Sequence, residues 1–337
     1  MRAVFHTILL AAVVLIAAVP VRAQEAAYRE PDDTSIFSLQ WENDIFTGRG
    51  TDRHYTNGLR FSLLRGDDQV PGWLLGVARA LPWFPDGGYV RGSWALGQNL
   101  YTPEDINTRD LVVDDRPYAA WLYLGRGLVL ENGRVLDIME LSVGVVGPAA
   151  FGEQMQTAIH EFIDSPDPRG WHNQLGNELA VQAIWQRKWR QLHEDNPGGF
   201  GVDVLPHVGG ALGNVFIYGS TGATVRLGFD LPSDYGSPRI QPALPGSEFF
   251  VPTRRLSGYI FLGGEARAML RNLFLDGNTF QDSHSVDKHW LVADFQAGAA
   301  LVSNGVRLAY TYVVRTEEFK HQDGFDAFGA FTLSVRL

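Results

Sequence analysis

Segments in which apolar and polar residues alternate recur along this chain and constrain its fold more than any other feature. In VRLAYTYVVRT, residues 306 to 316, Leu308 and its alternate neighbours are apolar or aromatic, whereas Arg307 begins a polar series on the opposite side. GYIFLGGEARAML (258 to 270) and HWLVADFQAGAAL (289 to 301) follow the same pattern. Segments of about ten residues with one apolar and one polar face, separated by turns, are typical of transmembrane β-barrels.

Such segments number about twelve and lie near residues 35–45, 55–65, 92–101, 118–130, 134–146, 178–191, 201–212, 216–229, 257–270, 288–302, 305–316 and 327–337. Their number is even, as in bacterial outer-membrane barrels. A soluble β-sandwich is the alternative, because its strands also alternate. The apolar faces are rich in Leu, Val, Tyr and Phe, and compact Greek-key spacing is absent. The sequence therefore predicts an all-β fold, a transmembrane antiparallel β-barrel of about 12 strands.

The N-terminal segment MRAVFHTILLAAVVLIAAVPVRA predicts export. Arg2 precedes an apolar run from Ile8 to Val19, and small residues end the segment at Ala23. This pattern predicts a signal peptide over residues 1–23, with the barrel in residues 24–337. An uncleaved single-span anchor is the alternative, but the apolar run is short for a spanning helix. We therefore expect the protein in the bacterial outer membrane.

Composition narrows the possible partners. The chain has no cysteine, which excludes a disulfide scaffold and thiolate metal sites. The net charge of −10 argues against nucleic acid and favours cations, although solubility of the loops and lumen explains it equally well. We expect a membrane-embedded monomer.

Strand order assigns the connections to two sides of the membrane. With both termini periplasmic, the tight turns 131–133 and 303–305 fall on the inner side. Five connections then face outward, namely 44–55, 102–117, 147–177, 271–287 and 317–326. The connections 66–91 and 230–256 are long although they fall on the inner side, where short turns are the rule. The first, around Trp73, is expected to contain a short interfacial helix.

The stretch WENDIFTGRGTDRHYTNG, residues 41 to 58, has more hydrogen-bonding groups than a turn needs. Asp44 lies beside Asn43 and across from the pair that begins with Thr56, so oxygen atoms gather there, and Ca²⁺ binds such oxygens. Solvation of a loop is the alternative role for Asp44. Simple alternation points Asp44 into the lumen and Asn43 towards lipid, so a bulge or an early strand end is needed if both serve one site.

A second group of polar residues lies in EQMQTAIHEF, which predicts a short helix. Gln156 and His160 stand four residues apart on one helix face, where they could orient a water molecule, and a histidine suits general-base chemistry. The alternative for His160 is a structural role. Asp115 and Arg116 are expected to form a structural ion pair. G-x-S-x-G, H-E-x-x-H and P-loop motifs are absent, which disfavours a serine lipase or a zincin.

Taken together, these motifs resemble the LpxR family of outer-membrane lipid A 3′-O-deacylases. The matching elements are WENDIF, D-x-x-YTNG from Asp52, QNLYTP, DDRPYA and GVVGP…GEQ-x-Q-x-x-x-H…GW-x-NQ-x-x-NE. The resemblance spans essentially all of the chain after the signal peptide. It implies a twelve-stranded barrel with a calcium-dependent esterase site that removes the 3′-linked acyloxyacyl group of lipid A.

The resemblance also implies roles for individual residues. His160 matches the family's catalytic histidine, and its partners in the site match Asn43, Asp44, Thr56 and Gln156, with Asp44 and Thr56 as the metal ligands. Two positions depart from the family pattern: Pro166 stands where a glutamate is expected, with Asp164 and Asp167 nearby, and Thr108 stands where a lysine is expected. These departures leave a non-enzymatic barrel (a porin or a structural protein) open as an alternative. An outer-leaflet phospholipase with similar base-and-calcium chemistry is another alternative.

Overall fold

The computed structural model describes residues 32–337 except 49–52, 86, 191, 195–198, 233, 237–238, 241–248 and 251–255. The predicted signal peptide and Asp52 therefore lie outside the described residues. Of residues 192–194 only the backbone is described.

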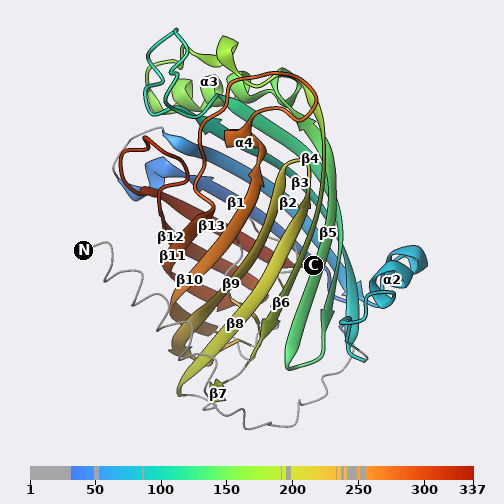
Figure 1. The fold of residues 1–337 in the computed structure, drawn as a ribbon. Helices are drawn as coiled ribbons and strands as arrows, with labels where there is room; N and C mark the ends of the chain where they lie inside the picture. The colour runs from blue at the N-terminus through green and yellow to red at the C-terminus, as the bar shows by residue number, and fades with distance from the viewer. Residues whose placement is uncertain are drawn as a thin grey trace.

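The strands form one closed antiparallel barrel (Figure 1). In chain order they are β1 (Ile36–Asn43), β2 (His54–Asp67), β3 (Tyr89–Thr102), β4 (Ala119–Glu131), β5 (Val135–Val146), β6 (Glu178–Trp189), β7 (Leu192–Glu194), β8 (Phe200–Gly213), β9 (Phe216–Phe229), β10 (Leu256–Asn272), β11 (Leu291–Ser303), β12 (Val306–Arg315) and β13 (Asp326–Arg336). The short β7 continues β6 along β8, so the ring has twelve positions, and β1 closes it on β13. The predicted barrel is confirmed, and a sandwich is excluded.

Alternation along the strands separates the lumen from the outer wall. On β12, Arg307 and Thr311 are buried in the lumen, whereas Leu308 on the opposite face is 56% exposed. The outer wall bears many other exposed leucine and phenylalanine side chains. Burial of one face and exposure of an apolar face is the pattern expected for a barrel wall that contacts lipid.

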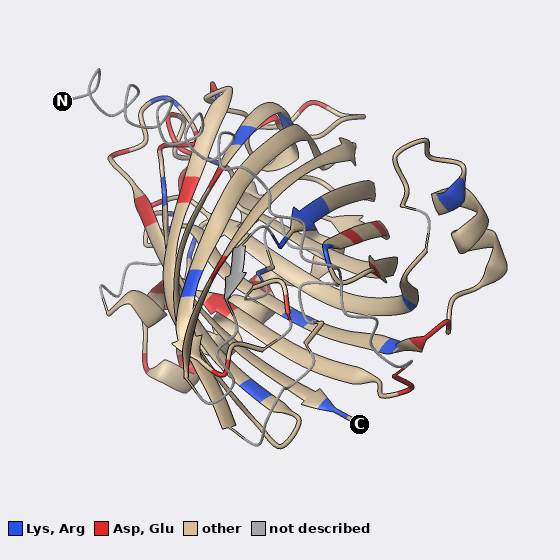
Figure 2. Cartoon of the chain, turned by 90° about the horizontal axis from the view of Figure 1, so that it is seen from below, with Lys and Arg blue, Asp and Glu red and all other residues tan. Residues whose placement is uncertain are grey.

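Ion pairs fill the lumen, and Figure 2 shows acidic and basic residues on many strands. Arg60 donates to Glu140 at 2.7 Å, and Asp294 accepts from Arg267 at 2.8 Å and from Arg315 at 2.9 Å. Buried charges are costly unless they are paired, so this lumen is stable only as a connected network.

The inner connection between β9 and β10 is long, and its described residues fold into the lumen. Ile240 donates its backbone N–H to Glu42 Oε1 at 2.7 Å. Phe250 is fully buried, with the Arg307 guanidinium 4.7 Å from its ring centre. These described residues therefore occupy part of the lumen, which argues against the porin alternative.

The two ends of the barrel differ as the sequence predicts. At one end, Asn304 and Gly305 have φ angles of 49° and 80°, which suit a two-residue hairpin turn. The C-terminus lies at the same end, since Leu337 donates its N–H to the Ser35 carbonyl at 2.8 Å. We call this the inner end, and the opposite end, with α3 (Gly152–Ile163), the outer end.

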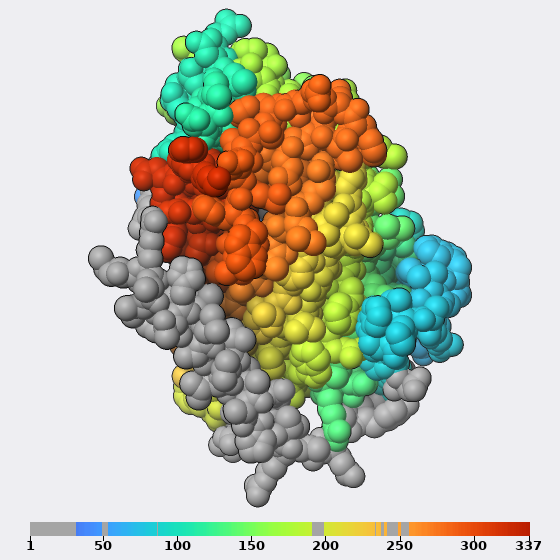
Figure 3. All heavy atoms as spheres, viewed as in Figure 1, coloured from blue at the N-terminus to red at the C-terminus, as the bar shows by residue number. Residues whose placement is uncertain are grey.

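The expected helix in the connection 66–91 is present as α2 (Gly72–Arg79). Leu74 and Ala78 pack against the wall, whereas Trp73 and Val77 are 62% and 60% exposed. Figure 3 shows α2, in blue, standing out from the side of the barrel. Among the described residues no helix combines the length and the apolar character needed to cross a bilayer.

This orientation makes a prediction for trypsin acting on intact cells. Cleavage is expected after Arg109 and Lys320, which are exposed in outer connections, and not after Arg79 and Arg134, which are exposed at the inner end. Mass spectrometry of the released peptides, before and after permeabilisation of the outer membrane, checks it. Cleavage at the inner pair without permeabilisation would invert the strand directions.

Candidate active site

The outer connection between β5 and β6 packs on the outside of the barrel wall. It contains η2 (Pro148–Ala150), α3 and η3 (Trp171–Asn173). Leu100 and Ala120 occupy outward positions on β3 and β4, yet both are fully buried because they pack with Ala150 and Trp171. This small apolar cluster fixes α3 against the wall at the outer end (Figure 1).

The predicted helix is confirmed as α3, and its buried face consists of Gly152, Gln156 and His160. Their spacing of four residues places them on one side of the helix. At position 152 a Cβ atom would lie 2.5 Å from the Ala120 Cβ and 2.5 Å from the Trp171 ring. Only glycine therefore lets the helix approach the wall this closely, and Gln156 and His160 are carried inward with it.

Trp171 fixes the orientation of the Gln156 side chain. The indole N–H of Trp171 donates to Gln156 Oε1 at 2.8 Å. An indole nitrogen can only donate, so the amide oxygen must face it and the amide nitrogen must point elsewhere. Gln156 Nε2 is buried and has no hydrogen-bond partner among the described residues. The site thus contains a buried N–H donor that an acceptor could satisfy.

His160 is held by the backbone of Pro166. Its Nδ1 lies 2.6 Å from the Pro166 carbonyl oxygen, which can only accept, so Nδ1 has the proton and Nε2 is the basic nitrogen of the neutral ring. Position 166 is one of the two departures from the family pattern. There a main-chain carbonyl contacts the histidine, while Asp164 ends α3 and is exposed, as is Asp167.

β1 ends at Asn43. An early strand end was one of the two arrangements, with a bulge, that would let Asn43 and Asp44 serve one site. Asn43 Oδ1 accepts the N–H of Ile45 at 2.8 Å, and its Nδ2 donates to Asn57 Oδ1 at 3.2 Å. Asp44 then begins η1 (Asp44–Thr47) and is buried, with Oδ2 accepting the N–H of Arg53 at 2.9 Å. The turn of the chain at Asn43 takes Asp44 out of strict alternation.

A separate bulge lies in β2 at Thr56. The pairing of β2 with β3 shifts between Tyr55 and Asn57, which leaves Thr56 as the additional residue. Tyr55 faces the lumen and donates to Glu42 at 2.9 Å, whereas Asn57 bonds Asn43 on the outward face. The buried Thr56 hydroxyl lies 2.7 Å from that of Thr102.

An apolar groove joins α3 to the end of β1. It has a volume of about 190 Å³ and is lined by Trp41, Asn43, Ile45, Phe46, Ala158, Ile159, Phe162 and Ile163. The groove therefore places Asn43 beside the helix that bears Gln156 and His160. Asp44 follows Asn43 in the chain, and Thr56 precedes Asn57, which accepts a hydrogen bond from Asn43. The second departure, Thr108, lies in another outer loop, where its carbonyl oxygen would be 3.3 Å from a Cβ placed at Gly170.

The comparisons with known proteins identify the family. The sequence matches the family described as "Outer membrane protein LpxR" over residues 8–337. The chain belongs to the LpxR family. It is an outer-membrane protein, and this membership supports an enzyme that modifies lipid A.

One solved structure has the same fold. LpxR from Salmonella typhimurium is 21% identical, covers 90% of this chain and 100% of its own, and superposes with a TM-score of 0.73. The β domain of the Bordetella autotransporter BrkA is 11% identical, covers 91% of this chain and 99% of its own, and has a TM-score of only 0.42. Comparison with curated protein sequences gives no match.

Charged residues join the loops around the site of this LpxR-family protein. His54 lies 2.7 Å from Asp326 and 3.5 Å from Asp115, and Arg116 donates to Glu318 at 3.1 Å. The predicted ion pair of Asp115 with the Arg116 side chain was therefore wrong. From Arg116, Asp115 accepts only the backbone N–H, and it also accepts the N–H of Glu104 at 2.7 Å. Burial opposes ionisation of Asp115, but hydrogen bonds and the charge of His54 outweigh it and hold its pKa below the usual range.

Sequence reasoning missed two residues of the candidate site, Trp171 and Thr102, and noted Asn57 only as the neighbour of Thr56. Trp171, Asn57 and Thr102 contact Gln156, Asn43 and Thr56, as described above. Each lies within a motif quoted for the family resemblance, which was the one available signal. No group of three or more histidine or acidic side chains that could bind a metal occurs among the described residues.

Proposed function

We propose that this protein is a calcium-dependent esterase that removes the 3′-linked acyl group of lipid A. The observation that carries the proposal is the placement of His160 and Gln156. Both are buried on the inner face of α3, against the outward wall of the barrel and beside the apolar groove. A soluble substrate would not need a site on the lipid-facing wall.

The position of the groove suits a lipid in the outer leaflet. It lies at the outer end, and its lining is almost entirely apolar. Lipid A is confined to the outer leaflet, so its acyl chains reach the wall at this level. The groove would hold one acyl chain while the ester carbonyl lies near the polar groups of α3.

The residues of the site suit hydrolysis by water. His160 Nε2 would accept a proton from water as the water oxygen attacks the ester carbonyl. The Gln156 amide N–H would donate to the carbonyl oxygen as negative charge develops there. When the resulting tetrahedral intermediate collapses, the bond from the carbonyl carbon to the sugar oxygen breaks. The histidinium then returns its proton to that oxygen. The products are a free fatty acid and a sugar hydroxyl, and no serine nucleophile is required.

Asp44 and Thr56 would hold the calcium ion, with Asn43 positioning the water or the oxyanion. The donor set suits this ion, because Asp44 offers a carboxylate and Thr56 a hydroxyl oxygen, and Ca²⁺ prefers oxygen ligands. When bound, Ca²⁺ supplies positive charge that stabilises the oxyanion.

Filling the groove tests this proposal. Ala158 lines the groove and is exposed, so Ala158→Trp should block the acyl chain without disturbing the core. We expect hydrolysis of full-length lipid A to fall at least about tenfold, which a loss of about 1.4 kcal/mol in transition-state binding would give. A soluble short-chain ester should be hydrolysed as before.

Glu161→Trp is the matched control, because residue 161 is also exposed on α3 but lies outside the groove. It should leave both rates unchanged. If Ala158→Trp hydrolyses lipid A at the wild-type rate, the groove does not bind the acyl chain.

A further inference from the structure

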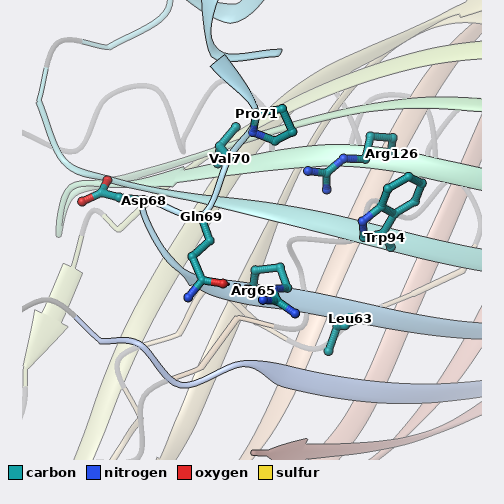
Figure 4. A pocket seen from close by; sticks show the side chains of 8 residues that line it. All are labelled: Leu63, Arg65, Asp68, Gln69, Val70, Pro71, Trp94 and Arg126. Atoms are coloured by element: carbon teal, nitrogen blue, oxygen red, sulfur yellow. Dashed lines mark hydrogen bonds between the residues drawn. The ribbon is translucent and has the colours of Figure 1, made fainter. Parts of the chain in front are cut away.

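A second pocket lies on the outside of the barrel, near the inner end and remote from α3. It has a volume of about 550 Å³ and is lined by Leu63, Arg65, Asp68, Gln69, Val70, Pro71, Trp94 and Arg126 (Figure 4). It occupies β2, β3 and β4 at the point where the chain leaves β2 for α2. Neither the family match nor the proposed esterase site accounts for it.

The pocket presents two guanidinium groups on the lipid-facing wall. The Arg126 guanidinium lies 4.7 Å from the ring centre of Trp94, and Arg126 donates to the Ser93 carbonyl at 2.6 Å. Arg65 donates through Nε to the Gln69 amide oxygen at 3.0 Å. These contacts orient both side chains without neutralising them. Among the residues that the structure describes, neither arginine forms an ion pair, although the Asp68 carboxylate lines the same pocket.

The pocket lies at the level in the membrane where a lipid headgroup is expected. Across the three strands, Leu63 pairs with Trp94, and Trp94 with Arg126, so the three form one row. Towards the outer end the wall exposes Phe61, Leu96 and Leu124, at 39%, 49% and 52%. An arginine and a tryptophan at the edge of an apolar band mark the membrane interface, because outward arginines cost little there and much at the bilayer centre.

The neighbouring helix is consistent with this depth. Two exposed side chains of α2, Trp73 and Val77, are apolar, Arg79 is exposed at its end, and Trp83 beyond it is 47% exposed. An amphipathic helix of this kind lies in the interface with its apolar face in the lipid. The two arginines are therefore at the headgroup level of the inner leaflet, where lipid A is absent and glycerophospholipids are the lipids present.

We propose that Arg65 and Arg126 bind the phosphate of a glycerophospholipid in the inner leaflet. Two guanidiniums offer parallel N–H donors that match phosphate oxygens, and the anion relieves their mutual repulsion. The acyl chains run outward along Phe61, Leu96 and Leu124. Such a lipid fixes the depth of the barrel in the membrane. The inference does not depend on the esterase activity, because the two sites lie at opposite ends.

Native mass spectrometry of the full-length barrel released from detergent tests the proposal. With added dioleoylphosphatidylglycerol, we expect one retained lipid per barrel, and its occupancy should fall at least about tenfold in Arg65→Gln/Arg126→Gln. The matched control is Arg79→Gln/Arg134→Gln, which removes the same charge from exposed positions at the same end. The control should bind as wild type, and heat-modifiable migration should show that both variants are folded.

Two further ligands separate a lipid from a simple anion. Dioleoylglycerol, which lacks the phosphate, should not be retained, and millimolar inorganic phosphate should not displace the phospholipid. Equal retention of dioleoylglycerol, displacement by inorganic phosphate, or wild-type binding by the Arg65→Gln/Arg126→Gln variant would each overturn the proposal.

Discussion

Replacement of His160 by alanine should lower lipid A deacylation by roughly 10² to 10⁴, the range typical for loss of a general acid–base group. The barrel should remain folded and heat-modifiable, because His160 lies on α3, outside the strands that close the ring. The substitution removes the hydrogen bond from Nδ1 to the Pro166 carbonyl and leaves the strand pairing untouched. Initial rates with purified protein and lipid A measure the effect.

His172→Ala is the matched control for damage to the same loop. His172 is exposed in η3, whereas His160 is buried on α3. We expect the control to retain most of its activity. Equal losses in the two variants, or an active His160→Ala protein, would show that another group accepts the proton.

Removal of calcium should abolish the activity, and Asp44→Asn should raise the calcium concentration needed for half-maximal rate by about tenfold or more. The substitution keeps the shape of a buried side chain whose Oδ2 accepts the Arg53 N–H, but it removes the negative charge. Calcium sites depend strongly on the number of charged ligands. The measurement is the activity of protein that has been treated with a chelator and then titrated with Ca²⁺ or with Zn²⁺. We expect Ca²⁺ to restore more activity than Zn²⁺.

Asp110→Asn is the control for general loss of outer negative charge, because Asp110 is exposed in another outer loop. Its calcium requirement should match that of the wild type. Full activity of the wild-type protein in excess chelator would remove calcium from the mechanism.

The sequence predicted the barrel well because alternation is a local property. The polar face at Arg307 and the apolar face at Leu308 can be assigned without knowing any partner strand. The helix around His160 was also predictable, since the buried residues Gln156 and His160 repeat at the helical period. The two-residue turn at Asn304 and Gly305 depends on the same kind of short-range chemistry.

Contacts between distant parts of the chain were not predictable in this way. The partner of Arg116 is Glu318, 202 positions away, whereas the sequence suggested its neighbour Asp115. Nothing in the composition of the connection 230–256 indicates that Ile240 would bond Glu42 inside the lumen. Such pairings depend on how the barrel closes. Closure brings together residues that are far apart in the sequence, and a local sequence pattern does not reveal which ones.

The site shows the same division. Its motifs could be located by sequence, but the bulge that turns Tyr55 inward and Asn57 outward follows from the register of β2 with β3. The orientation of Gln156 likewise depends on Trp171, fifteen residues away, and on the packing of that indole beside Ala120. The sequence could therefore identify the residues of the site, but their arrangement in space could be known only from the folded structure.

Mass spectrometry of lipid A from bacteria with and without this gene tests the central claim most directly. The account predicts that cells with the gene contain lipid A lacking the 3′-linked acyloxyacyl group, and that cells with the His160→Ala variant resemble cells without the gene. Identical lipid A in all three strains, or a change confined to the glycerophospholipids, would contradict it.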